Sequence, residues 1–177
     1  MEKSYKEYLN NINTFIFDVD GVYTDGSLLI DNNGNLLRAM NVKDGYATKL
    51  ALTLGYNICI ITGGNNEAVK SRLSTLGVTD IYLNSHDKIV AFNDYCSKKM
   101  ITPEQALYMG DDMPDIPVMT RIGLPTCPQD AVAEVKAVSK YISHKKGGQG
   151  CVRDVIEQVL KVQGKWPTSE ERKITSV

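Results

Sequence analysis

The sequence has few of the features that identify secreted, membrane or nucleic-acid-binding proteins. Its four cysteines are far apart and form no CxxC pair, so neither a disulfide framework nor a structural zinc site is expected. No apolar run approaches the roughly 20 residues that span a bilayer, and the charged N-terminus has no apolar signal core. With a net charge of -1, the chain has no broad basic field for nucleic acid or anionic membranes. We therefore expect a cytoplasmic protein with reduced thiols that binds neither nucleic acid nor membrane.

The composition is that of an ordinary globular protein. Hydrophobic residues make up 42% and charged residues 23% of the 177 positions, which is enough for one domain with a sizeable core. We expect a single domain over residues 1–163. From residue 164 the sequence turns polar, which predicts a disordered tail over residues 164–177.

The most informative stretch lies near the N-terminus. Residues 14–17 (Thr-Phe-Ile-Phe) predict a short buried strand that ends in two carboxylates, Asp18 and Asp20. Gly21 follows and permits a turn that other residues resist. Ligand sites of open α/β sheets gather at the carboxyl ends of strands. Acidic turns after core strands are also common where there is no functional site. Whether Asp18 and Asp20 belong to such a site therefore depends on the residues that the rest of the chain places beside them.

Downstream, predicted strands alternate with predicted helices. The expected strands cover residues 14–17, 57–61, 80–83, 106–109, 122–124 and 141–143, and the expected helices cover 44–54, 65–76, 88–99, 131–138 and 151–162. Two apolar runs around Asn33-Gly34 add a β-hairpin within residues 27–40. This alternation predicts an α/β fold of the Rossmann type, with a mostly parallel sheet, helices on both faces and a protruding hairpin.

Four of these strands end in polar residues that would meet at one edge of the sheet. They are Asp18 and Asp20, then Thr62, then a loop reaching Lys88, then Asp111 and Asp112 with Asp115 nearby. Carboxylates gathered at one point repel each other, so the site favours a cation. Carboxylate oxygens without His or Cys select Mg²⁺. The Thr62 hydroxyl, the backbone amides of Gly63-Gly64 and the Lys88 ammonium would together bind a phosphate group.

In order and spacing, these motifs resemble the haloacid dehalogenase superfamily of phosphotransferases. The resemblance covers residues 14–163 and rests on DxDG at 18–21, Thr62-Gly63, Lys88 and GDDxxD at 110–115. Within the superfamily, segments 18–26, 43–45, 110–115 and 147–150 are similar to the 3-deoxy-D-manno-octulosonate 8-phosphate (KDO 8-phosphate) phosphatase family. That family makes a sugar acid for lipopolysaccharide. The resemblance implies a Mg²⁺-dependent phosphomonoesterase that works through an aspartyl-phosphate.

The resemblance also implies a role for each motif residue. Asp18 would be the nucleophile and Asp20 the general acid and base. Mg²⁺ would bind Asp18, the backbone carbonyl of Asp20, and Asp111. The remaining residues would serve the phosphoryl group and the metal: Thr62, Gly63 and Lys88 hold phosphoryl oxygens, while Asp112 and Asp115 orient metal-bound waters and Lys88.

The gaps between the motifs are too short for a cap domain. Only the hairpin and one helix separate Asp18 from Thr62, and one helix and a turn separate Lys88 from Asp111. The resembled family closes its capless site as a homotetramer, which implies a tetramer here with residues 27–40 at the interface. Segment 147–150 is expected to be a flexible loop and a candidate lid over the site.

The sequence departs from the family at Gly64, where many members have an arginine. An arginine there could pair with a substrate carboxylate, and Lys43, Lys70 or Arg72 are candidate substitutes. This leaves open a phosphatase for a nine-carbon keto-sugar acid.

Two other classes of protein are alternatives. A receiver domain would carry its acidic pair and its phosphorylated aspartate in the reverse order. A non-catalytic oligomerisation module should have lost motif residues that are all present here. His86 and His144 are expected on the surface, and Tyr23 and Tyr46 are expected to pack rather than bind substrate.

Overall fold

The computed structural model describes residues 4–167. Its elements follow in chain order: α1 (Tyr5–Leu9), β1 (Thr14–Phe17), β2 (Leu29–Ile30), β3 (Leu36–Leu37), α2 (Val42–Thr53), β4 (Asn57–Ile61), α3 (Glu67–Thr75), β5 (Asp80–Tyr82), α4 (Lys88–Lys99), η1 (Pro103–Gln105), β6 (Ala106–Met109), η2 (Met113–Asp115), α5 (Ile116–Met119), β7 (Leu124–Cys127), α6 (Ala133–Val138), β8 (Tyr141–Ile142) and α7 (Cys151–Val162).

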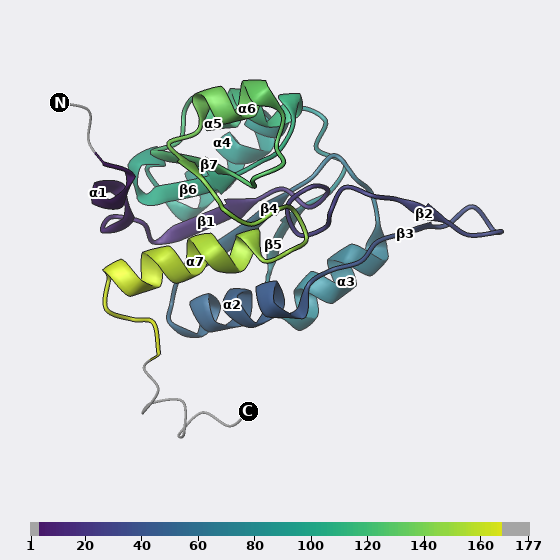
Figure 1. The fold of residues 1–177 in the computed structure, drawn as a ribbon, viewed down its shortest axis with the longest axis horizontal. Helices are drawn as coiled ribbons and strands as arrows, with labels where there is room; N and C mark the ends of the chain where they lie inside the picture. Colours follow the sequence, from purple (N-terminus) through teal and green to yellow (C-terminus); the bar gives the residue numbers. More distant parts are fainter. Residues whose placement is uncertain (1–3, 168–177) are drawn as a thin grey trace.

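Six parallel strands form the central sheet in the order β5-β4-β1-β6-β7-β8. Helices α4, α5 and α6 cover one face and α2, α3 and α7 cover the other (Figure 1). The antiparallel pair β2-β3 projects from this body as a separate hairpin. The predicted α/β architecture, including the hairpin, is confirmed.

Strand β1 is fully buried at the centre of the sheet and has a core on each side. Phe15 and Phe17 point into the cluster beneath α2 and α7, whereas Ile16 points into the cluster formed with α4, α5 and α6. This alternation follows from the two-residue period of a strand. Because both faces are covered, the strand needs apolar residues along its length, as Phe15, Ile16 and Phe17 are, while the buried Thr14 hydroxyl donates to Asn13 Oδ1 at 2.7 Å.

The fifth strand of the sheet lies later in the chain than predicted. The sequence predicts this strand at residues 122–124, yet β7 runs through Pro125, a residue type that is usually excluded from the interior of a sheet. The Pro125 carbonyl accepts a hydrogen bond from the Lys140 backbone N–H at 2.9 Å. The N–H that proline lacks would face the same side, just before the β7–β8 ladder begins at Thr126. The strand therefore loses little by containing a proline.

The segment 147–150 is packed rather than loose, contrary to the expected flexible loop. The Gly147 N–H donates to Asp130 Oδ1 at 2.9 Å, and the Gly148 N–H donates to the Val22 carbonyl at 2.9 Å. A Cβ at Gly147 would lie 2.0 Å from the Gly21 carbonyl oxygen. This close approach fixes the segment against the loop that follows β1.

The first residues of the predicted tail are packed against the domain. The backbone N–H groups of Lys165 and Trp166 both donate to the Leu160 carbonyl, and the Trp166 ring packs against the core. Residues 164–166 thus continue the packing of α7. Residues 168–177 of the predicted tail lie outside the described residues.

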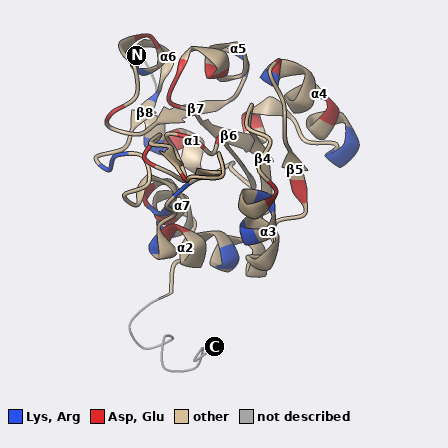
Figure 2. Ribbon diagram, turned by 90° about the vertical axis from the view of Figure 1, so that its right-hand side faces the viewer, with Lys and Arg blue, Asp and Glu red and all other residues tan. Residues whose placement is uncertain are grey.

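Charges of both signs are interspersed over the ribbon (Figure 2). Within residues 4–167, no helix combines the length and apolar character that a bilayer crossing requires.

Candidate active site

A cleft of about 350 Å³ opens at the carboxyl edge of the sheet, where β1, β4 and β6 end side by side. This is where parallel sheets bind ligands. All eight site residues predicted from the sequence line it: Asp18, Asp20, Thr62, Gly63, Lys88, Asp111, Asp112 and Asp115. Gly26, Gly64, Ser85, His86 and Pro114 complete the lining.

Asp18 follows directly after β1, and its carboxylate is held at both oxygens. Oδ1 accepts a hydrogen bond from the Val19 N–H at 2.6 Å, and Oδ2 lies 2.7 Å from Lys88 Nζ. The residue is only 6% exposed. Burial, together with the nearby charge of Asp115, raises its pKa to about 6 despite Lys88. The Asp18 carboxylate is thus held in one orientation, and the positive charge of Lys88 does not fully offset the cost of its burial beside Asp115.

Lys88 is the first residue of α4 and points its ammonium between two carboxylates. Its Nζ lies 2.6 Å from Asp115 Oδ1 as well as 2.7 Å from Asp18. Burial lowers the pKa of Lys88, but the charges of Asp18 and Asp115 outweigh it and raise that pKa overall. Lys88 therefore remains a cation at the floor of the cleft.

Asp115 connects these groups to strand β6. Its Oδ1 accepts a second hydrogen bond from the Tyr108 hydroxyl at 2.6 Å. Its Oδ2 accepts from the backbone N–H groups of Asp111 at 3.0 Å and Asp112 at 3.2 Å. A Cβ at Gly110 would lie 2.3 Å from the Asp115 Cγ, so this packing requires glycine there. With its oxygens engaged, Asp115 serves to hold its neighbours in place.

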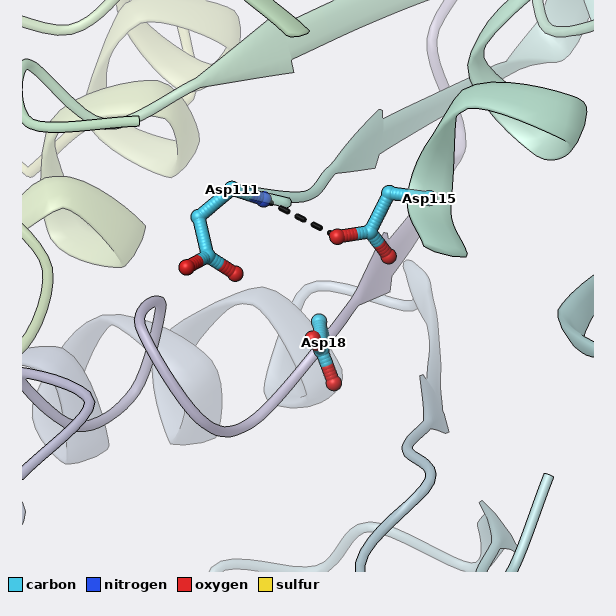
Figure 3. Close-up of side chains that lie close together, drawn as sticks. All are labelled: Asp18, Asp111 and Asp115. Atoms are coloured by element: carbon cyan, nitrogen blue, oxygen red, sulfur yellow. Dashed lines mark hydrogen bonds between the residues drawn. The ribbon is translucent and has the colours of Figure 1, made fainter. Parts of the chain in front are cut away.

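Asp18, Asp111 and Asp115 each direct a carboxylate toward a shared space (Figure 3), and one oxygen of each lies within 4.8 Å of the others. Asp111 Oδ1 is buried and has no hydrogen-bond partner among the described residues. Burial and the charges of Asp18 and Asp115 raise the pKa of Asp111 to about 8. Asp115 accepts four hydrogen bonds or ion-pair contacts and Asp18 accepts two, whereas Asp111 Oδ1 accepts none, so the cluster offers a cation hard oxygens of the kind that fit Mg²⁺.

The turn after β4 faces this cluster across the cleft. Thr62 is buried, its N–H donates to the Tyr82 carbonyl at 3.0 Å, and its Oγ1 accepts from the Gly64 N–H at 3.2 Å. These contacts tie the Thr62-Gly63-Gly64 turn to β5. The turn therefore brings the Thr62 hydroxyl and the Gly63 backbone to the cleft wall, a suitable lining for a phosphate.

Asp20 has a partner that the sequence reasoning missed. Arg38, which follows β3 of the hairpin, donates from Nε to Asp20 Oδ1 at 2.7 Å and from Nη2 to Oδ2 at 3.0 Å. The candidates considered for a missing cation, Lys43, Lys70 and Arg72, do not line this cleft. Nothing local in the sequence marks Arg38, because the contact exists only once the hairpin folds back over the end of β1.

The aromatic and histidine predictions have mixed outcomes. Tyr23 is buried and its hydroxyl lies 2.8 Å from Thr48 Oγ1, as expected of a packing residue. Tyr46 is 50% exposed and lies against Arg153, and neither tyrosine lines the cleft. His144 is exposed and away from the cleft. His86 is exposed too, but it lines the cleft mouth.

Comparison with known proteins agrees with this geometry. A family model for haloacid dehalogenase-like hydrolases matches residues 60–156. The 3-deoxy-D-manno-octulosonate 8-phosphate phosphatase KdsC of Salmonella typhi is 42% identical over 155 residues, covering 88% of this chain and 82% of that protein. The homologous protein of Escherichia coli K12 is also 42% identical over 155 residues, with the same coverage.

Solved structures give the same result. The KDO 8-phosphate phosphatase of Yersinia pestis superimposes with a TM-score of 0.90 at 36% identity, covering 93% of this chain and 89% of that one. The enzyme of Moraxella catarrhalis, solved with magnesium, phosphate and KDO, superimposes with a TM-score of 0.88 at 32% identity, covering 90% and 92%. The chain belongs to the haloacid dehalogenase-like hydrolases, in the branch that contains the KDO 8-phosphate phosphatases.

Proposed function

We propose that this protein is a Mg²⁺-dependent phosphatase that hydrolyses KDO 8-phosphate to KDO and phosphate, a step toward lipopolysaccharide precursors. Its curated relatives carry this activity in their names, and a solved neighbour holds magnesium, phosphate and KDO together. The observation that carries the proposal is the buried Asp18 carboxylate, held 2.7 Å from Lys88 Nζ at the floor of the cleft.

In the first step, an Asp18 oxygen attacks phosphorus and the bond between phosphorus and the sugar oxygen breaks. Asp20 gives its proton to that leaving oxygen, so the sugar departs as an alcohol and Asp18 becomes an aspartyl-phosphate. The Val19 N–H and Lys88 hold the attacking carboxylate in one orientation. Such fixed geometry removes part of the entropic barrier to attack.

In the second step, water attacks the phosphorus of the aspartyl-phosphate while Asp20 takes a proton from it. The bond between phosphorus and the Asp18 oxygen breaks, which releases phosphate and restores the carboxylate. Throughout, the Thr62 hydroxyl, the Gly63 N–H and the Lys88 ammonium bind phosphoryl oxygens. Asp115 keeps Lys88 in position through its 2.6 Å contact.

We assign Mg²⁺ to Asp18, Asp111 and the backbone carbonyl of Asp20. When bound, the ion supplies positive charge that offsets the phosphoryl oxygens and the crowded carboxylates. Asp112 lies beside this position at the cleft rim and would orient water near the ion. Asp115 holds Asp111 in place through the hydrogen bond that its Oδ2 accepts from the Asp111 backbone N–H.

We further propose one catalytic domain over residues 1–163 without a cap, assembled as a homotetramer through segment 27–40. The hairpin supports this assembly, because its strands expose Leu29 and Ile30 by 68% and 67%. Exposed apolar patches of this kind mark protein interfaces. We also propose a cytoplasmic location, since all four cysteines are free thiols. Light scattering should give four subunits for the native chain and fewer for a Leu29→Ser/Ile30→Ser variant.

The activity is tested by phosphate release from KDO 8-phosphate, a nine-carbon keto-sugar acid 9-phosphate and neutral sugar phosphates, with Mg²⁺ and with EDTA. We expect the highest kcat/KM on KDO 8-phosphate and none with EDTA. A preference for the nine-carbon substrate would support the alternative sugar. No turnover of any substrate by folded protein would support a non-catalytic module. Asp18→Asn, an isosteric change, should remove turnover and leave folding intact.

A further inference from the structure

Arg38 and Asp20 form a two-point contact at the edge of the cleft. Two guanidinium nitrogens, Nε and Nη2, donate to the two different oxygens of the carboxylate, at 2.7 and 3.0 Å. A third nitrogen, Nη1, donates to the Leu36 carbonyl at 3.2 Å, which ties the guanidinium back to the hairpin. A planar fork on a carboxylate fixes both its position and the orientation of its plane.

The burial of this pair is asymmetric. The Arg38 side chain is only 8% exposed although it comes from a hairpin whose strands are exposed, whereas the Asp20 side chain is 34% exposed. The Asp20 carboxylate thus remains partly accessible from the cleft, while the buried Arg38 guanidinium binds it from the protein side. Gly64 leaves the space beside them free: a Cβ there would lie 3.5 Å from Asp20 Oδ2 and 3.7 Å from Arg38 Nη2.

Asp20 has little other support for its carboxylate. Thr24 Oγ1 donates to Asp20 Oδ1 at 3.4 Å, a long contact that orients the group weakly. Asp18, by comparison, is held by a backbone N–H at 2.6 Å and an ammonium at 2.7 Å. The direction in which Asp20 faces the cleft is therefore set mainly by Arg38.

We propose that Arg38 is a positioning residue, which aims the Asp20 carboxyl group at the leaving oxygen of the substrate and so makes catalysis depend on the hairpin. This inference rests on the proposed acid and base role of Asp20. When one Asp20 oxygen carries a proton, the hydrogen bond that Arg38 donates to that oxygen can break. The hydrogen bond to the other oxygen remains and still orients the carboxyl group. In the second step, the ionised carboxylate regains both contacts as water is activated.

The leaving group of the substrate provides a test that a merely structural role would not satisfy. The sugar alkoxide of KDO 8-phosphate needs a proton to depart, whereas p-nitrophenolate leaves p-nitrophenyl phosphate without one. Arg38→Met should lower kcat on KDO 8-phosphate by about 10- to 100-fold with KM little changed. On p-nitrophenyl phosphate, the first-turnover release of p-nitrophenolate, which precedes water activation by Asp20, should stay within about threefold, which also shows that the site is folded.

Three further variants complete the experiment. Arg38→Lys keeps the charge but cannot form the fork, so it should recover only part of the loss. Arg121→Met removes an exposed arginine after α5 and should leave both substrates unaffected. Asp20→Asn should show the same leaving-group pattern more strongly, and adding Arg38→Met to it should cost little more.

The outcomes separate this inference from the function on which it rests. Suppose that Asp20→Asn slows the reaction of KDO 8-phosphate much more than that of p-nitrophenyl phosphate. If Arg38→Met then lowers the rates on both substrates equally, or lowers neither rate, the positioning role is wrong and the proposed chemistry stands. If Asp20→Asn lacks the pattern, Asp20 is not the proton donor and both proposals fail. If Arg38→Lys had the full activity of the native protein, the two-point contact would not be needed, since a positive charge alone would then suffice.

Discussion

Gly21 and Asp111 lie so close together that only glycine fits at position 21. A Cβ built on Gly21 would sit 1.9 Å from Oδ2 of Asp111, and the Gly21 backbone has φ = +83°, in the left-handed region. Glycine enters this region without the steric cost that other residues meet. The absence of a side chain is what allows the carboxylate after β6 to reach the end of β1, where the proposed cation would bind.

Replacing Gly21 with alanine should therefore displace Asp111. We expect Gly21→Ala to raise the Mg²⁺ concentration needed for half-maximal activity by about 10- to 100-fold, the usual effect of disturbing the surroundings of a metal ligand. Gly55→Ala is a matched control, because Gly55 has φ = +84° but no atom within 4 Å of its would-be Cβ. Titrating activity with Mg²⁺ in both variants separates the clash from backbone strain. Equal effects in the two variants would show that strain alone is responsible.

Lys88 and Lys98 lie at opposite ends of α4 and should differ sharply in importance. Lys88 is 5% exposed between two carboxylates, whereas Lys98 is 65% exposed and pairs with Asp94. Lys88→Met should lower the free energy of unfolding by about 3 kcal/mol and abolish turnover, since it leaves buried charges unpaired. Lys98→Met should change stability by less than about 1 kcal/mol. Urea unfolding without Mg²⁺ measures both, and similar losses would contradict the buried-pair account.

Much of this site could be predicted from the sequence, because a parallel sheet brings the ends of its strands together. Asp18, Thr62 and Asp111 each follow a buried apolar run, so locating the strands was enough to group them. The fold explains why Arg38 was missed: its partner Asp20 lies across a hairpin, and no periodic pattern links them. Similarly, Tyr108 reads as a core residue of β6, and only the structure shows its hydroxyl on Asp115.

The misplaced strand has a comparable cause. Pro125 argues against a strand locally, but its missing N–H falls where β8 has not yet begun to pair. The position of such a residue within the sheet, rather than its type, decides whether it is tolerated.

Asp44 gives the stability of the fold a pH dependence away from the cleft. It is fully buried in the first turn of α2, and its Oδ1 accepts from the Arg153 N–H in the first turn of α7 at 2.7 Å. Burial raises its pKa from 3.8 to about 6. The folded state therefore binds the proton more tightly than the unfolded chain, so the contribution of Asp44 to stability falls as pH rises from about 4 to about 6.

Asp44→Asn keeps an oxygen acceptor for Arg153 but has no charge to bury. Relative to the native protein, the variant should gain stability between pH 4 and pH 7, by up to about 3 kcal/mol. Urea unfolding of both proteins at the two pH values measures this difference, in which other titrating groups cancel. A difference that stays constant with pH would show that the buried carboxyl does not titrate in this range.

Cation binding should release protons from the site. Because the pKa of Asp111 is about 8, its carboxyl is largely protonated at pH 7 and must ionise to hold Mg²⁺. Calorimetric titration in two buffers of different ionisation enthalpy should therefore report release of roughly one proton per ion. In Asp111→Asn, the affinity should drop and the proton release should disappear. Mg²⁺ binding with identical heats in both buffers would contradict the assignment of Asp111.

The most direct measurement is chemical trapping of the phosphorylated enzyme. Protein quenched during turnover of KDO 8-phosphate and treated with borohydride would have its acyl-phosphate reduced, which converts the aspartate to homoserine. Peptide mass spectrometry should find homoserine at position 18, with none in Asp18→Asn or in protein given EDTA. Homoserine at Asp20 or Asp111, or turnover with no modified residue at any time point, would contradict Asp18 as the nucleophile.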